Sequence, residues 1–385
     1  MHRIAINPGV LRWARERAGL SVADLQGKFP RLADWEAEAV QPTMRQLENF
    51  AKATRAPFGF LFLPEPPDIP LPFADFRTLE SQRPQGISPE LMDTIHLMQR
   101  RQAWLREEWI EAEAEPLGFV GAAKLSDDPA ATGQEMRRVL GLGDGWAQRV
   151  STWTAAVGEL RNAIEDLGVM AVINGVVGNN TRLKLDVNEF RGFALSDPHA
   201  PLIFVNGADA KSAQMFTLAH ELAHLWLGDA GEGLSGFQGL QPGDGDVERF
   251  CDQAAAEFLV PAAEIRTAWR MVADSDARFE KLAARFKVSP VVIGRRAMDL
   301  DLIERNEFFS FYHDYTHNER RKTQTGAGGG DFYNNQNTRV GRLFASHLIR
   351  AAKEGRIGFK EAYDLTGLNG GTFQRYARKL EITLP

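Results

Sequence analysis

The chain has 385 residues, a single cysteine and a net charge of −6, from 45 Lys and Arg against 51 Asp and Glu. One cysteine excludes an intramolecular disulfide and the thiolate-rich zinc folds, so a metal site would have to use histidine and carboxylate. The slightly negative net charge argues against a protein that coats nucleic acid along its length, although such a chain can still carry a local basic patch. No run of 18 apolar residues and no signal-peptide core occur, which predicts a cytoplasmic protein without a membrane span.

The chain divides into parts of different composition, and its length predicts two or three domains. Residues 1–63 are typical of a short helical unit, in which Ser21 with Asp24 and Thr43 with Gln46 predict capping boxes. Residues 64–90 hold seven of the 19 prolines, which predicts an extended linker. A mostly helical stretch, 91–166, follows.

Three short runs then combine β-branched or aromatic residues with flanking turn formers, which predicts strands at 169–177, 190–196 and 201–206. Two helical patterns come next, at 209–227 and 246–260. Their predicted caps are Asp209 and Gly228 for the first helix, and Asp246 and Pro261 for the second.

The strongest chemical signal is the pentapeptide HELAH at positions 220–224, inside the first of these helices. Residues four apart share a helix face, so His220 and His224 can grip one ion. Glu221 lies about 100° round the helix, within reach of a water at that ion. The alternative is a pair of core histidines, but burying these groups without a shared partner is costly.

Two histidines leave a catalytic zinc one protein ligand short. In the helix at 246–260, Glu248 shares a face with small side chains at 251 and 255, which would let the two helices approach closely. Glu248 is therefore the best third ligand. Its rival, Glu257, lies about 180° away on the helix. The alternative for Glu248 is a first-turn carboxylate that only complements the helix dipole.

These residue types predict metal-assisted hydrolysis, with Zn²⁺ as the expected ion and Mn²⁺ as the alternative. Zinc lowers the pKa of a bound water to about 7, and Glu221 would act as general base and then general acid. Residues 201–206 could form an edge of the substrate cleft. The Gly-rich loop 228–245 is either a lid or a connector. Candidates by type for an oxyanion donor are His199, Tyr312, His313, Tyr315 and His317.

The remaining residues, 266–385, predict a helical C-terminal domain. The segment VSPVVIGRRAMDLDLI (288–303) is typical of two helices joined by a turn, either for core packing or for substrate recognition. A Gly-rich stretch at 326–330 precedes the last helices. Altogether the expected fold class is α+β, mostly α, divided as 1–63, 64–90, 91–265 with the peptidase core, and 266–385.

The block FTLAHELAHLWLG, followed by ERFCDQAAAEFLVP, resembles the ImmA/IrrE metallopeptidases. Their second block usually has Ala-Asn where this chain has Cys251 and Asp252. The resemblance implies a zincin-like peptidase core with one catalytic Zn²⁺, ligands His220, His224 and Glu248, and Glu221 as base. It also implies that the protein substrate is a helix-turn-helix repressor, whose cleavage switches on stress-response or mobile-element genes.

Residues 6–63 resemble the Xre/Cro type of helix-turn-helix, with two departures. The stretch 25–35 is about four residues shorter than the usual pattern, and Glu38 stands where glycine is preferred. Residues 1–63 hold nine Lys and Arg against six Asp and Glu, a net +3. An alternative function is thus a DNA-binding regulator whose metallo-domain serves as sensor or docking unit. Candidate phosphate contacts are Arg12, Arg15, Arg17, Lys28 and Arg31.

Overall fold

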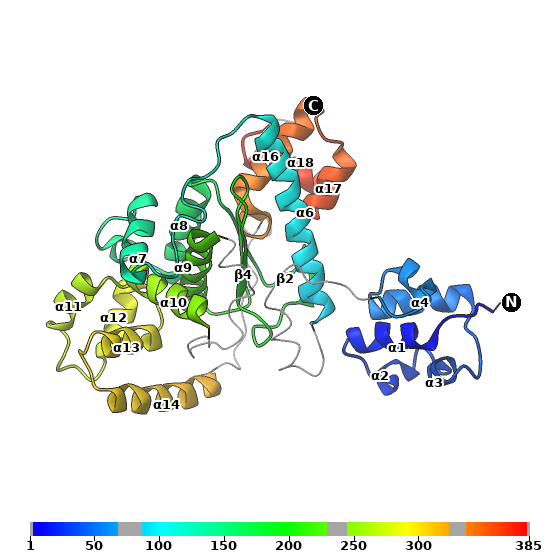
Figure 1. The fold of residues 1–385 in the computed structure, drawn as a ribbon, viewed down its shortest axis with the longest axis horizontal. Coiled ribbons are helices and arrows are strands. Elements are labelled where there is room, and N and C mark those ends of the chain that lie inside the picture. Colours follow the sequence, from blue (N-terminus) through cyan, green and yellow to red (C-terminus); the bar gives the residue numbers. More distant parts are fainter. Residues whose placement is uncertain (1–2, 68–86, 229–244, 323–335, 383–385) are drawn as a thin grey trace. The chain divides into compact units, whose positions relative to one another are not determined.

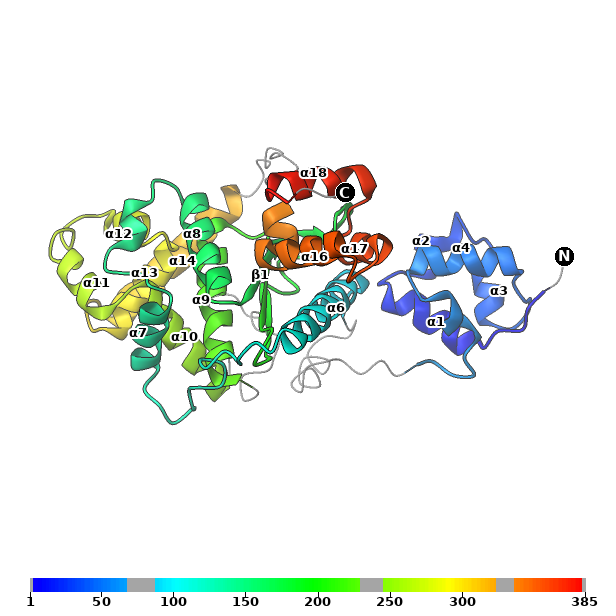
Figure 2. The same cartoon turned by 90° about the horizontal axis from the view of Figure 1, so that it is seen from above.

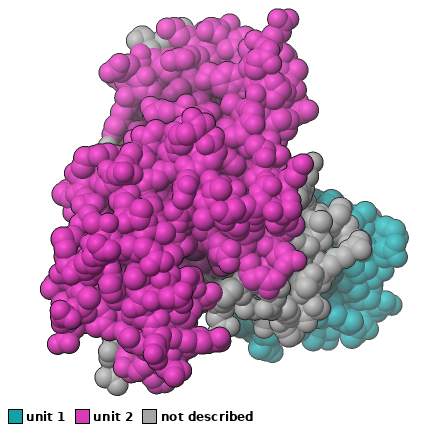
Figure 3. Space-filling view, turned by 60° about the vertical axis from the view of Figure 1, so that its left-hand side comes forward, with its two compact units in different colours: residues 1–96 teal, residues 97–385 magenta. Residues whose placement is uncertain are grey.

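The computed structural model describes residues 3–67, 87–228, 245–322 and 336–382 (Figure 1). The chain divides into two compact units, residues 1–96 and 97–385, which Figure 3 shows in different colours. The predicted linker and the Gly-rich loop fall largely outside the described residues, and the stretch 326–330 falls wholly outside them. No helix within the described ranges is long and apolar enough to cross a membrane.

The first unit is helical, as its sequence predicts. Its elements are α1 (Pro8–Arg17), α2 (Val22–Gln26), α3 (Leu32–Glu36), α4 (Met44–Thr54) and the 3-10 turn η1 (Phe58–Phe62). Both predicted capping boxes are present, at Ser21 and Thr43. The shortened stretch leaves α2 and α3 with five residues each. Glu38 has φ +57°, the left-handed conformation that explains the usual preference for glycine there.

The second unit begins with helices that lead into a sheet. These are α6 (Pro89–Glu111), which starts in the first unit, α7 (Pro129–Val139), the 3-10 turn η2 (Trp146–Arg149) and α8 (Trp153–Asp166). After the sheet come α9 (Lys211–Leu227), α10 (Asp246–Leu259), α11 (Ala262–Trp269), α12 (Arg278–Phe286), α13 (Pro290–Asp299) and α14 (Arg305–Lys322). One apolar core joins α8, α9 and α10 to α11, α12 and α13. The domain boundary expected at residue 265 therefore falls inside a helix of a continuous core.

The main sheet has three strands in the order β1 (Met170–Asn174), β5 (Leu202–Asn206), β4 (Gly192–Leu195). β5 pairs parallel with β1 and antiparallel with β4, with Gly192 opposite Val205. Residues 201–206, which the sequence analysis places at an edge of the substrate cleft, form the central strand β5, and β4 lies at the edge of the sheet. All five residues of β5 are buried, which suits a strand covered on both faces and both edges.

The run 169–177 was expected to be one strand, but the chain bends at Gly175. β1 ends at Asn174, and β2 (Val176–Val177) turns away to pair with β3 (Asn180–Lys184), an exposed strand that the sequence patterns did not predict. A Cβ at position 175 would lie 2.8 Å from the backbone nitrogen of Ala208, so this close passage requires glycine.

The two helices after the sheet match the predicted ranges closely, but two caps differ. α9 has Ala210 at its N-cap, because the carboxylate of Asp209 instead pairs with Arg191 at 2.9 Å. α10 has Gly245 at its N-cap, so that Asp246 is its first helical residue. The predicted ends are confirmed. Gly228 caps α9 with φ 62°, and α10 ends at Leu259, two residues before Pro261.

Helices cover both faces of the main sheet. Figure 1 shows α8 and α9 on one side of the strands and α6 on the other. A π-helical turn, η4 (Asn337–Gly341), lies beside β1, where Gly341 closely approaches Met170 and Val172. The last helices are α16 (Arg342–Glu354), α17 (Phe359–Thr366) and α18 (Gly370–Lys379). Of these, α16 and α17 lie next to α6 in both views (Figures 1 and 2).

Candidate metal centre

The motif at 220–224 lies in the second half of α9, in the most deeply buried part of that helix. Every residue from Thr217 to Leu227 is buried. His220 and His224 project from one face, with their Nε2 atoms 3.0 Å apart. The helical spacing thus brings both imidazoles to one point inside the protein.

Glu248, in the first turn of α10, meets both histidines. Its two carboxylate oxygens lie 3.2 Å from Nε2 of His220 and 3.4 Å from Nε2 of His224. The ligand atoms of these three residues all fall within 4.8 Å of one another. Glu248 is partly exposed, at 30% of its side chain, so the cluster opens to solvent on the side of this carboxylate.

The donor set suits a zinc ion. Two ligands about 2.0–2.1 Å from a tetrahedral zinc lie roughly 3.3 Å apart. The nitrogen and oxygen atoms here are spaced at 3.0–3.4 Å, close to that value. Three protein ligands of this type would leave the fourth position for water, as in catalytic zinc sites. That the three residues hold a metal stays a prediction from their chemistry and convergence.

Charge is strongly coupled within this cluster. Burial raises the pKa of Glu248, but hydrogen bonds from His220 and His224 outweigh it and hold that pKa well below its usual range. Burial lowers the pKa of His224, yet the neighbouring Cys251 and Glu248 raise it to about 9 overall. Metal binding at these imidazoles would therefore release protons.

Glu221 is fully buried beside the cluster. Burial raises the pKa of its carboxyl to about 8, the charge of His220 opposes this shift and that of Glu248 adds to it. A carboxyl group with a pKa near the working pH can both take and return a proton. The environment of Glu221 thus suits the acid–base role that its position in the motif predicts.

Two further residues of α10 adjoin the cluster: Asp252, to which the sequence analysis gives no role, and Cys251, which it treats as a small packing residue. Oδ1 of Asp252 lies 2.9 Å from Nδ1 of His220, the ring nitrogen that faces away from the other histidine. A carboxylate in this position orients a metal-binding imidazole. The Cys251 thiol is buried beside His224. The sequence does indicate that they are neighbours of the cluster. Cys251 and Asp252 follow Glu248 by three and four residues, which places all three side chains on one face of α10.

The rival ligand, Glu257, has a different environment. It forms a buried ion pair with Arg296 of α13 and also accepts a hydrogen bond from Gln134 of α7 at 3.0 Å. Arg296 in turn donates to the carbonyl of Val260, at the end of α10. Glu257 therefore joins α10 to α7 and α13, on the side away from the histidines.

The five oxyanion candidates lie in two places. Four are in α14, where Tyr312 stacks on Phe308, Tyr315 packs on Phe311 and His313 packs on His317. His199 lies between β4 and β5, where its backbone N–H donates to Asp197. None of these contacts involves the cluster, so the contacts do not single out one of the five residues as the oxyanion donor.

The edge strand β4 runs directly beside the motif at Gly192. A Cβ built there would lie 2.5 Å from Cγ2 of Thr217, 2.8 Å from the carbonyl oxygen of Phe204 and 2.9 Å from Oε1 of Glu221. The absence of a side chain at 192 thus lets the strand and α9 approach closely enough to fix the position of Glu221.

We expect Gly192→Ala to lower both stability and hydrolytic activity. The added methyl group must displace Thr217 or the Glu221 carboxylate, and overpacking of this kind costs about 1–3 kcal/mol. Denaturant unfolding and activity assays would measure the two effects. Gly158→Ala is a matched control, because a Cβ at position 158 meets no atom within 4 Å. Unchanged activity in Gly192→Ala would contradict this view of the strand.

The arginines proposed to contact DNA in the first unit differ in their surroundings. Arg15 is nearly buried and paired with Glu36 at 2.6 Å, while Arg17 lies over the ring of Trp13 and donates to the carbonyl of Arg55. The remaining three, Arg12, Lys28 and Arg31, are exposed. Arg12 and Arg31 also form ion pairs, with Glu36 at 3.8 Å and with Asp34 at 3.0 Å. Four of the five candidates therefore have structural contacts of their own, and a role of any of the five in DNA binding stays a prediction.

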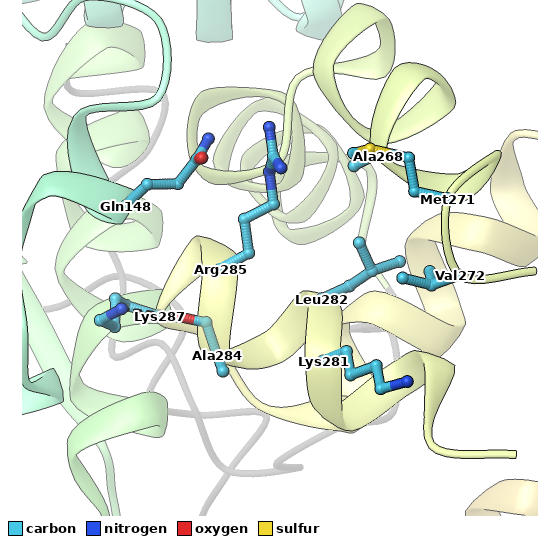
Figure 4. Close-up of a pocket in the computed structure, with 9 residues that line it drawn as sticks. All are labelled: Gln148, Ala268, Met271, Val272, Lys281, Leu282, Ala284, Arg285 and Lys287. Carbon is cyan, nitrogen blue, oxygen red and sulfur yellow. Dashed lines mark hydrogen bonds between the residues drawn. The ribbon is translucent and has the colours of Figure 1, made fainter. Parts of the chain in front are cut away.

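A pocket of about 390 Å³ lies away from the cluster, among η2, α11 and α12. Figure 4 shows Gln148 and Arg285 on one side of it and Ala268 and Met271 on the other. None of the histidines or glutamates described above lines it. It belongs to the helical packing of the unit.

Comparison with known families bears on two segments of the chain. Residues 340–379 match a domain of unknown function, DUF8813. Residues 165–298, from the end of α8 to α13, match the IrrE N-terminal-like domain, Peptidase M78, and this range includes the complete cluster. No curated protein matches the chain. The match to residues 165–298 supports a metallopeptidase of the ImmA/IrrE type.

Proposed function

We propose that the protein is a zinc-dependent endopeptidase that cleaves a helix-turn-helix transcriptional repressor in the cytoplasm and so switches on stress-response or mobile-element genes. The observation that carries the enzymatic part is the convergence of His220, His224 and Glu248 beside the buried Glu221. The repressor as substrate rests on the resemblance of the two sequence blocks to the ImmA/IrrE peptidases.

His220, His224 and Glu248 would hold the zinc ion, which when bound acidifies a water and polarises the substrate carbonyl. Glu221 then takes a proton from the attacking water at its carboxylate and returns it to the leaving amine. Asp252 keeps the His220 ring oriented through Nδ1. These roles use only side chains that α9 and α10 bring together.

The edge strand suggests how a protein substrate would be held. β4 lies at the edge of the three-stranded sheet and, among the described strands, pairs only with β5. An extended peptide added along that edge would bind through main-chain hydrogen bonds, largely independent of its sequence. Because Gly192 of β4 lies against Glu221, such a peptide would pass close to the general base.

The test uses the purified full chain and the helix-turn-helix repressor encoded by a neighbouring gene. Incubation with Zn²⁺ should produce one discrete cut, which mass spectrometry locates. A chelator should abolish the cut and added zinc should restore it. Cleavage that persists in excess chelator would show that the hydrolysis does not depend on this centre. If the zinc-loaded protein cuts casein but leaves the repressor intact, the proposed peptidase activity stands and the repressor is excluded as its substrate.

A further inference from the structure

The last two helices, α17 and α18, are joined by a turn of three residues. Gly367 opens the turn with φ +68°, Leu368 turns into the core at 5% exposure, and Asn369 forms a capping box with Thr372. A turn of three or four residues that contains glycine is the connection found in helix-turn-helix motifs. The backbone after Thr366 therefore has the form of that motif.

Buried side chains hold this motif firmly on the second unit. Phe373 of α18 packs against Phe359 and Tyr363 of α17. The hydroxyl of Tyr376 donates to Asn337 in η4 at 2.9 Å. From α6, the fully buried Arg101 donates to the last carbonyls of α17 and η4. These contacts give α18 a defined orientation, which precise recognition requires.

The outer face of α18 is polar and basic. Its buried residues are Phe373, Tyr376 and Ala377. Its exposed residues recur at intervals of three and four and so form one stripe: Gly371, Gln374, Arg375, Arg378 and Lys379. No acidic residue interrupts the stripe.

Charge separates this part from the rest of the protein. Residues 336–382 hold nine Lys and Arg against four Asp and Glu, a net charge of +5. Since the whole chain carries −6, the other residues together carry −11. A basic segment in an acidic chain, built on a helix-turn-helix and with three of its nine basic side chains on the exposed face of α18, has the electrostatic features of a DNA-binding surface.

We propose that α16, α17 and α18 form a helix-turn-helix module that binds duplex DNA, with α18 in the major groove. Gln374 and Arg375, in the first half of the exposed stripe, are the side chains placed to read base edges, since Gln pairs with adenine and Arg with guanine. Arg378 and Lys379 contact phosphates. The site is distinct from the first unit and does not depend on the proposed peptidase activity.

The test measures binding of the full-length protein to a fluorescent duplex of about thirty base pairs, about three helical turns. The key variant combines Arg375→Gln, Arg378→Gln and Lys379→Gln. The matched control combines Lys124→Gln, Arg266→Gln and Arg270→Gln, which removes the same charge from exposed positions elsewhere in the second unit. Fluorescence anisotropy is recorded over a salt series, and melting curves verify the fold of both variants.

We expect the α18 variant to lose at least about tenfold in affinity, and the slope of log affinity against log salt to fall by roughly 2–3. The control variant should keep most of the affinity for duplex DNA and most of the salt slope. Gln374→Ala should alter the preference among duplex sequences while leaving the salt slope unchanged.

The proposal is overturned if the wild-type protein does not bind duplex DNA at low salt, or if the α18 variant binds as the wild type does. It is also overturned if only the control loses binding, which would place DNA contact elsewhere on the second unit. If the wild-type protein binds the repressor protein but not duplex DNA, and the α18 variant loses binding to the repressor, the stripe is a protein-docking face.

Discussion

Glu221→Gln should reduce peptidase activity by about 10²–10⁴-fold, the range expected for the loss of a general base. The amide matches the carboxyl group in shape but cannot accept the water proton. Because burial raises the pKa of Glu221 to about 8, the folded protein favours the neutral carboxyl, and a neutral amide in its place costs no stability at pH 7. The measurements are kcat/KM on the repressor, zinc content and the melting temperature.

The sign of this pH effect can be tested in the same experiment. The pKa of Glu221 in the folded protein lies above its value of about 4.3 in an unfolded chain. The unfolding free energy of the wild-type protein therefore falls as the pH rises from about 4.3 through 8. The glutamine variant lacks this loss and should melt at a relatively higher temperature as pH increases. A variant that retains zinc and fold but also retains the cut would exclude Glu221 as the base.

Glu248→Ala and Glu257→Ala should fail in opposite ways. Removing Glu248 takes away one of three converging ligands, so zinc affinity should fall by at least about a hundredfold, more than the loss of an outer-shell partner produces. Removing Glu257 leaves Arg296 buried without its carboxylate, which should cost about 3–5 kcal/mol of unfolding free energy while zinc still binds. Zinc titration and denaturant unfolding of both variants measure these effects.

Each of these variants serves as the control for the other, because both truncate a glutamate of α10 to alanine. Glu248 is partly exposed at the open side of the cluster, so the fold of its variant should remain close to wild type. A folded Glu257→Ala protein that no longer takes up zinc, beside a Glu248→Ala protein that does, would reverse the assignment of the third ligand.

Features that lie within a single helix were determined by the sequence alone. The spacing of four residues brought His220 and His224 to one face of α9, and the spacing of nine residues turned Glu257 away from Glu248 on α10. The two capping boxes of the first unit likewise followed from local pattern. Helical periodicity is a local property of the chain, so such features need no knowledge of what packs around them.

Features that depend on partners distant in the chain were decided only by the tertiary structure. β5 became the central strand because β1 and β4 both pair with it, and an apolar run gives no sign of strand order. Asp209 does not cap α9 because it pairs with Arg191, which directly precedes β4 and is 18 residues away in the chain. The same holds for the basic stripe of α18, since α17, η4 and Arg101 of α6 determine which side of that helix faces solvent. Burial and ion pairing arise between segments, and their choice of partner is settled only when the chain is packed.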